Sequence, residues 1–152
     1  MAKNRKQYEI METHYMKAGY YHPDKCFYCG VRPDTLDHVP PLSWAYSLGY
    51  QIMVDKHNAP FIKVPCCSEC NSLLNDKNIF SLDKRKEYIA ETLEKRYKKF
   101  VKNPKWELEE IKELTGNLKK FIRNVSDYKS HIDKRIDWAK SDPTIAYAKH
   151  YV

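Results

Sequence analysis

Four of the five cysteines occur in two pairs, each with two residues between its partners, and this spacing is suited to metal binding. The first pair is Cys26 and Cys29 in CFYCG, and the second is Cys67 and Cys70 in CSECN, about forty residues further along. Two such turns can place four thiolates around one zinc ion at about 2.3 Å. Because four cysteines leave no coordination position for water or substrate, we expect a structural zinc site rather than unrelated buried thiols.

The fifth cysteine, Cys66, stands directly before Cys67, so either thiol could in principle face the metal. Only Cys67 has the two-residue gap to Cys70. We therefore expect Cys66 to be a buried thiol outside the site.

Further polar residues that could take part in a reaction lie between and after the cysteine pairs. Asp37 and His38 are adjacent in LDHVPP, and Asn71 directly follows the last cysteine. Taken alone, an acid followed by a polar residue and two prolines is ordinary turn chemistry. The position of Asp37 and His38 between the two cysteine pairs favours a catalytic interpretation.

The ordered combination of CFYC, DHVPP and CSECNSLLNDK resembles the HNH endonucleases. These belong to the His-Me finger, or ββα-metal, nucleases, whose shared element is two strands and a helix around one divalent ion. The resemblance covers roughly residues 24 to 80, about a third of the chain. It implies that His38 is the general base and that Asp37 and Asn71 hold a catalytic Mg²⁺ or Mn²⁺, while structural zinc stays on the cysteines.

The implied roles agree with the chemistry of phosphodiester hydrolysis. An imidazole changes its charge near neutral pH and can take a proton from an attacking water molecule. A divalent cation offsets charge on the scissile phosphate and the departing 3′ oxygen, and carboxylate and amide oxygens are suited to such a cation. The resemblance therefore implies a metal-dependent endonuclease, in size and layout similar to nucleases encoded by phages or mobile elements.

The sequence departs from the family pattern in two places. Asn71 stands where the last histidine of HNH is found, a substitution that the family commonly shows. The middle asparagine, which orients the base, has no counterpart in FIKVP, and Asn58 is the nearest candidate. His57 beside it is either a ligand for phosphate or metal, or a surface histidine.

The first half of the sequence predicts one helix and then a compact metal-stapled module. Residues 4 to 18 place apolar side chains near one helical face, which predicts an amphipathic helix ending near Gly19. Residues 20 to 80 contain short apolar runs that suit strands and loops.

The second half is helical in pattern. Ser81 is available as an N-cap for a helix that Pro104 ends, and a longer apolar rhythm runs from Trp106 to Ile136. Gly116 interrupts this rhythm, which predicts a kink or a break into two helices. The expected fold is α+β and mostly helical, with an N-terminal helix (1–22), a zinc-stapled ββα-metal (HNH) module (23–80) and long C-terminal helices (81–152) in the same or an appended domain.

The formal net charge of +7 and the pI near 9.1 attract polyanions such as nucleic acid, and we expect DNA to be the partner. Basic residues gather in KRYKKFVK. They either contact the phosphates of a nucleic acid or form a solvated helix face. The candidate nucleic-acid-binding residues are Lys77, Lys95, Arg96, Lys98, Lys99 and Lys102.

The remaining expectations concern location, assembly and the rival function. No apolar run has signal-peptide or membrane-span length, so we expect a cytoplasmic protein of a bacterial or phage-infected cell. The C-terminal apolar rhythm suggests a homodimer, which would suit cleavage of both DNA strands. The alternative function is a non-catalytic zinc-knuckle module that binds nucleic acid or a protein.

Overall fold

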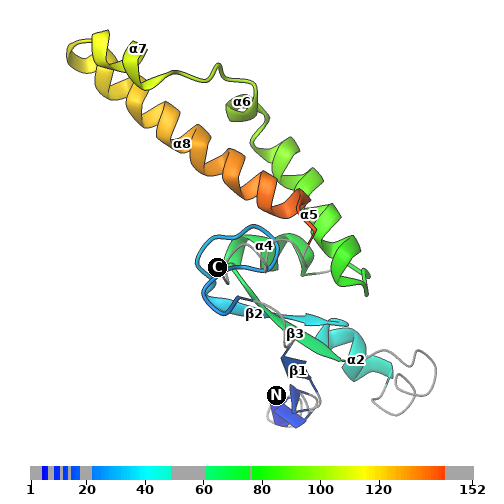
Figure 1. Ribbon diagram of the computed structural model, residues 1–152. Helices are drawn as coiled ribbons and strands as arrows, with labels where there is room; N and C mark the ends of the chain where they lie inside the picture. The colour runs from blue at the N-terminus through cyan, green and yellow to red at the C-terminus, as the bar shows by residue number, and fades with distance from the viewer. Residues whose placement is uncertain are drawn as a thin grey trace.

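Figure 1 shows the computed structural model, which describes residues 5–6, 9–10, 12–13, 15–17, 22–48, 61–75 and 77–142. His57 and Asn58 lie outside these residues. The first elements in chain order are β1 (Met16–Lys17), β2 (Thr35–Val39), α2 (Leu42–Leu48), β3 (Ile62–Cys66) and α4 (Ser68–Leu74). The later ones are α5 (Leu82–Arg96), α6 (Lys98–Val101), α7 (Leu108–Glu113) and α8 (Gly116–Lys140). Helices predominate, so the predicted α+β, mostly helical class is confirmed.

A three-stranded sheet has β3 in its centre, with β1 parallel on one side and β2 antiparallel on the other. β2 and β3 pair in a register that sets Asp37 opposite Val64 and His38 opposite Lys63. Because successive side chains of a strand point to opposite faces, Asp37 and His38 lie on different faces of the sheet. The Asp37 face is the buried one, since Val39, Val64 and Cys66 on that face are also buried.

The cysteine-bearing loop before β2 is fixed to the edge of β3. Pro65 lies beyond the two residues of β3 that pair with β1, so its lack of an N–H leaves that part of the sheet intact. Its carbonyl oxygen accepts a hydrogen bond from Phe27 N at 2.9 Å, and Cys66 O accepts one from Asp34 N at 3.2 Å. These two bonds position the loop beside the start of α4.

The helices α4, α5 and α8 cover the buried face. Figure 1 shows α4 between the sheet and the pair formed by α5 and α8. Ile89 and Leu93 of α5 pack with Ile132 and Ile136 of α8 in the same core as the cysteines. The other end of α8 extends away from the sheet together with α7 (Figure 1). The sheet, the cysteine-bearing loop and the helices therefore share one hydrophobic core on the buried face of the sheet that carries Asp37.

Two N-terminal residues differ from the predicted secondary structure. Met16 and Lys17 form β1, so the helix predicted to end near Gly19 does not include them. Their backbone pairs with Ile62 and Lys63 of β3, and this long-range pairing outweighs the local helical periodicity.

The C-terminal helices also break where the backbone leaves helical geometry. Ser81 caps α5 as predicted, with its hydroxyl accepting from Lys84 N at 3.5 Å. Tyr97, with φ −103° and ψ 20°, separates α5 from α6. Gly116 has φ +61° and begins α8 after α7, so the predicted break into two helices is confirmed.

Two glycines with positive φ provide a matched stability test. A Cβ at Gly30 (φ +75°) would lie 2.6 Å from the Trp138 ring, whereas a Cβ at Gly116 would meet nothing within 4 Å. We expect Gly116→Ala to cost about 1–2 kcal/mol from backbone strain alone, and Gly30→Ala to cost clearly more because Trp138 must move. Urea unfolding of the two zinc-loaded variants measures the difference, and equal losses would contradict it.

Candidate functional site

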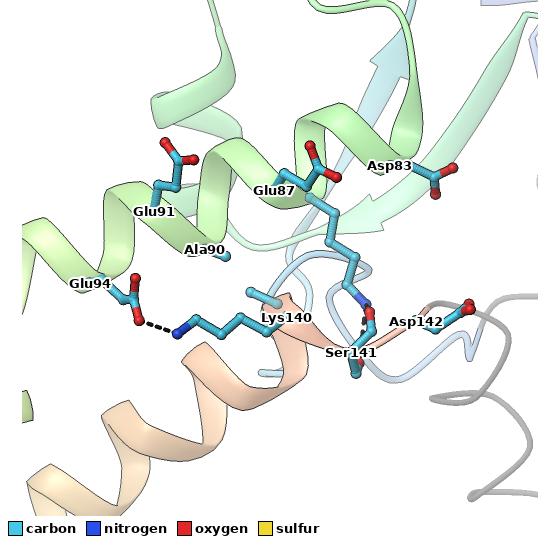
Figure 2. A pocket seen from close by; sticks show the side chains of 10 residues that line it. Asp83, Glu87, Ala90, Glu91, Glu94, Lys140, Ser141 and Asp142 are labelled. Atoms are coloured by element: carbon cyan, nitrogen blue, oxygen red, sulfur yellow. Dashed lines mark hydrogen bonds and ion pairs between the residues drawn. The ribbon is translucent and has the colours of Figure 1, made fainter.

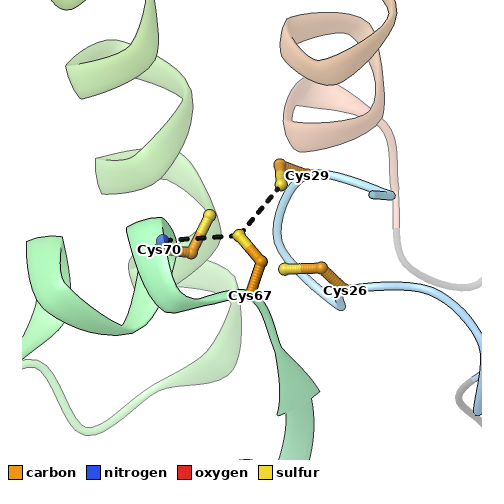
Figure 3. A group of neighbouring side chains, drawn as sticks. All are labelled: Cys26, Cys29, Cys67 and Cys70. Atoms are coloured by element: carbon orange, nitrogen blue, oxygen red, sulfur yellow. Dashed lines mark hydrogen bonds between the residues drawn. The ribbon is translucent and has the colours of Figure 1, made fainter. Parts of the chain in front are cut away.

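The side chains of Cys26, Cys29, Cys67 and Cys70 converge on one buried point (Figure 3). Their sulfur atoms all lie within 4.8 Å of one another, and the Cys29 and Cys67 sulfurs are 3.7 Å apart. Four ligands at about 2.3 Å from a tetrahedral ion would be separated by roughly 3.8 Å. The cluster could therefore hold a zinc ion, and it is the only such group of three or more His, Cys, Asp or Glu side chains among the described residues.

Each cysteine pair is shaped by local backbone hydrogen bonds. In the first turn, Gly30 N donates to Cys26 O at 2.9 Å, and Cys26 N donates to Val31 O at 2.6 Å. In the second, Cys67 is the N-cap of α4, and its sulfur accepts from Cys70 N at 3.5 Å. The sequence thus brings the pairs together through one tight turn and one helix start.

Cys66 lies outside the cluster, as predicted. Its side chain is fully buried, and its thiol donates to Cys67 O at 3.3 Å. Since Cys66 ends strand β3 on the core face, it packs as a small apolar residue.

The packing of four thiols has an electrostatic consequence. Hydrogen bonds from its three partner thiols, led by Cys26, lower the pKa of Cys67. Hydrogen bonding within the same cluster, again led by Cys26, raises the pKa of Cys70. A divalent cation must displace the protons that the raised thiols retain, so metal affinity should increase with pH.

A buried arginine of α8 adjoins the cluster. The Arg135 guanidinium lies 3.6 Å from Cys29 Sγ and 2.6 Å from Glu69 Oε2. Tyr97 donates to the other oxygen of Glu69 at 2.7 Å. The positive charge offsets the excess negative charge of a four-thiolate metal site and ties that site to α5 and α8.

The metal cluster makes a prediction with a control inside the chain. Wild type and Cys66→Ala should each bind one zinc ion, whereas Cys70→Ser should lose tight binding and most of the thermal stability gained from zinc. Metal analysis after dialysis and thermal unfolding with and without zinc measure both effects. Equal zinc retention in Cys70→Ser would refute the assignment of this thiol.

Asp37 is buried and accepts three hydrogen bonds from protein partners. Its carboxylate receives two hydrogen bonds from Arg85, at 2.7 Å to Oδ1 and 3.0 Å to Oδ2, and Tyr28 donates to Oδ2. Burial, followed by the nearby Asp37 charge, raises the pKa of Tyr28 well above its ordinary value, so the phenol remains a donor. Arg85 is 1% exposed and also donates to Ile79 O at 2.8 Å.

This ion pair limits what Asp37 can offer a cation. A carboxylate has about four acceptor positions, and Arg85 and Tyr28 occupy three of them. One position on Oδ1 is left. Because the Arg85 charge also repels a cation, a divalent ion at Asp37 would need further oxygen ligands from Asn71 and water.

His38 lies in a different environment on the opposite face. Its Nε2 is 3.3 Å from Glu12 Oε1, and its ring meets the edge of Tyr15 with centroids 4.9 Å apart. The Lys63 ammonium is 3.6 Å from the same Glu12 oxygen. The side chain of His38 is 14% exposed, so these neighbours cover most of it and a small part reaches solvent.

Asn71 lies in the first turns of α4, directly after Cys70, and is half-buried. Among the described residues its side chain makes no hydrogen bond. α4, which carries Asn71, packs against β2, which carries Asp37, and no hydrogen bond joins these two side chains among the described residues. The predicted trio is therefore divided, with Asp37 and His38 on separate faces.

A cavity of about 570 Å³ lies between α5 and α8 (Figure 2), and His38 is not among the residues that line it. Four acidic residues of α5 and one after α8 line it, namely Asp83, Glu87, Glu91, Glu94 and Asp142. Lys140 forms an ion pair with Glu94, and Lys86 donates to Ser141 O at 2.9 Å. Since this wall is mostly acidic, it disfavours a phosphate backbone.

The predicted basic residues near the end of α5 and in α6 are mostly exposed. Lys95, Lys98, Lys99 and Lys102 face solvent, and Arg96 forms an ion pair with Glu69 at 3.3 Å. Lys77 is half-buried, with its ammonium 5.7 Å from the centre of the Tyr88 ring. The exposed lysines thus remain open to a polyanion.

No protein-family model matches the chain, and comparisons with curated proteins and with solved structures find no significant match. Within the described part of the chain, every helix is too short or too polar to cross a membrane.

Three residues at this site were not predicted from the sequence. Glu12 and Arg85 lie in helical patterns far from the motif, and nothing in their spacing indicates a contact with His38 or Asp37. Tyr28 lies inside CFYCG, where an aromatic residue between two ligands gives a weak signal of burial. Only the pairing of distant segments reveals the three roles.

Proposed function

We propose that this protein is a metal-dependent endonuclease of the HNH type that hydrolyses phosphodiester bonds in DNA. The observation that carries the proposal is the four-cysteine cluster, which joins the loop before β2 to the start of α4. It thereby ties the strand bearing Asp37 and His38 to the helix bearing Asn71. Zinc at this cluster is structural, because four thiolates fill its coordination shell.

His38 acts as the general base in this proposal. Its side chain is 14% exposed on the face of β2 opposite Asp37, and the ammonium of its cross-strand partner Lys63 attracts an anionic phosphate. Asp37 and Asn71 would hold Mg²⁺ or Mn²⁺, which when bound offsets charge on the phosphate and on the leaving oxygen. The pair of Asp37 with Arg85 fixes β2 against α5, so the base has a defined position.

The charge distribution supports nucleic acid as the substrate. The chain has a net charge of +7, and the exposed lysines near the end of α5 and in α6 can contact phosphates. Because acidic residues line the cavity between α5 and α8, we expect phosphate groups to bind on other faces of the protein. Phosphate contacts of this kind give affinity without selecting a base sequence.

One observation favours the second candidate, a zinc module that binds nucleic acid without cutting it. The two-point contact with Arg85 gives Asp37 a structural role that requires no metal ion. His38 on the other face would then be a binding residue. The two candidates differ in whether His38 is needed for turnover.

Cleavage of supercoiled plasmid by the zinc-loaded protein tests the proposal. With added Mg²⁺ or Mn²⁺ we expect wild type to cut, and His38→Ala to lose about 10²–10⁴-fold in rate, because general-base catalysis contributes on that order. His131→Ala is the matched control, since His131 is exposed on α8. A control without divalent cation should be inactive.

A different outcome would contradict the nuclease proposal. If wild type and His38→Ala bind plasmid, branched and single-stranded DNA equally well and cut none of them, the binding module replaces the nuclease. Circular dichroism and zinc content must match among the variants.

We extend the proposal to a homodimer formed through α7 and the adjacent part of α8. Leu108, Leu118 and Phe121 expose 69%, 57% and 63% of their surface there, which is unusual for large apolar side chains. We expect wild type to sediment as a dimer at micromolar concentration and Phe121→Ser to shift toward the monomer. A wild-type monomer in sedimentation velocity would exclude the dimer.

A further inference from the structure

We propose that Glu12 is a positioning residue that fixes the ring of His38 for proton transfer. This inference rests on the proposed nuclease function and adds the N-terminal segment to its site. The strand pairing of β1 with β3 brings this segment onto the face of the sheet that carries His38 and Lys63.

Two contacts define the position of the imidazole. Glu12 Oε1 lies 3.3 Å from His38 Nε2, and the Tyr15 ring meets the imidazole at 87°. Tyr15 is itself held by its hydroxyl, which donates to Pro40 O at 2.5 Å. Tyr15 is 5% exposed, so the ring that supports His38 is fixed by packing as well.

The contact with Glu12 also selects the tautomer of His38. A carboxylate can only accept, so Nε2 must carry the hydrogen, and Nδ1 keeps its lone pair. Among the described residues nothing donates to Nδ1. The ring is therefore prepared to take a proton at Nδ1 while Glu12 stabilises the imidazolium that results.

The positive charge of Lys63 offsets the negative charge of Glu12, which would otherwise repel a phosphate bound near His38. Its ammonium is 3.6 Å from Glu12 Oε1, and Lys63 is the cross-strand partner of His38. The two opposite charges nearly cancel, so Glu12 can orient the base without repelling an anionic substrate. The side chain of Glu12 is 43% exposed, whereas those of Lys63 and His38 are 19% and 14% exposed, so solvent reaches the three residues chiefly at Glu12.

Glu12→Gln tests this role, with Glu9→Gln as the matched control. Glu9 belongs to the same segment but forms an exposed ion pair with Arg5 at 3.2 Å. A glutamine amide can donate or accept, so it no longer imposes one tautomer. We expect Glu12→Gln to lower kcat by about 10- to 1,000-fold with KM changed less than about threefold, and Glu9→Gln to leave both unchanged.

Nitrogen NMR of the His38 ring provides a readout that does not require activity. Wild type should show the tautomer with hydrogen on Nε2, and Glu12→Gln should show a mixture. Cleavage by wild type with an unchanged kcat in Glu12→Gln would overturn this inference and leave the nuclease standing, as would hydrogen on Nδ1 in wild type. Failure of wild type to cut any substrate would overturn the nuclease, and the role of Glu12 with it.

Discussion

The meeting of four thiols at one buried point is the constraint on which the rest of the fold depends. The loop that carries Cys26 and Cys29 has no strand or helix of its own, and the bonds that fix it lead to β3 and to α8. A bound metal ion would cross-link this loop to the start of α4 and replace apolar core that the segment lacks. The same point gathers the long helices, because Arg135 of α8 lies against Cys29. Sheet, loop and helical arm are thus anchored at one place.

The buried pair of Asp37 and Arg85 is the second link between the module and the helices. Removing two charges from water is costly, and only good geometry with further hydrogen bonds offsets it. Here the guanidinium makes two contacts with the carboxylate, Tyr28 adds a third and Ile79 O satisfies another donor. The two hydrogen bonds of such a pair form only in one relative orientation of guanidinium and carboxylate. The pair therefore orients α5 relative to β2 more strictly than apolar packing would.

The cysteine cluster could be predicted from the sequence because its ligands are set by local spacing. The two-residue gaps also distinguished Cys67 from Cys66, and Ser81 and Gly116 gave local signals for a cap and a break that the structure contains. The residues around Asp37 and His38 could not be predicted, because Glu12 and Arg85 reach them only through tertiary pairing. Met16 and Lys17 show the same limit, since a helical rhythm says nothing about a distant strand that competes for the backbone.

The alternation of Asp37 and His38 on β2 has a consequence for register. A slip of one residue against β3 would exchange the two side chains between the faces of the sheet. The imidazole would then be buried against the Arg85 guanidinium, and the carboxylate would face Glu12 on the open side, where like charges repel. Both exchanges are unfavourable, so the different side chains of Asp37 and His38 select one alignment of β2 against β3 over the two that differ by one residue.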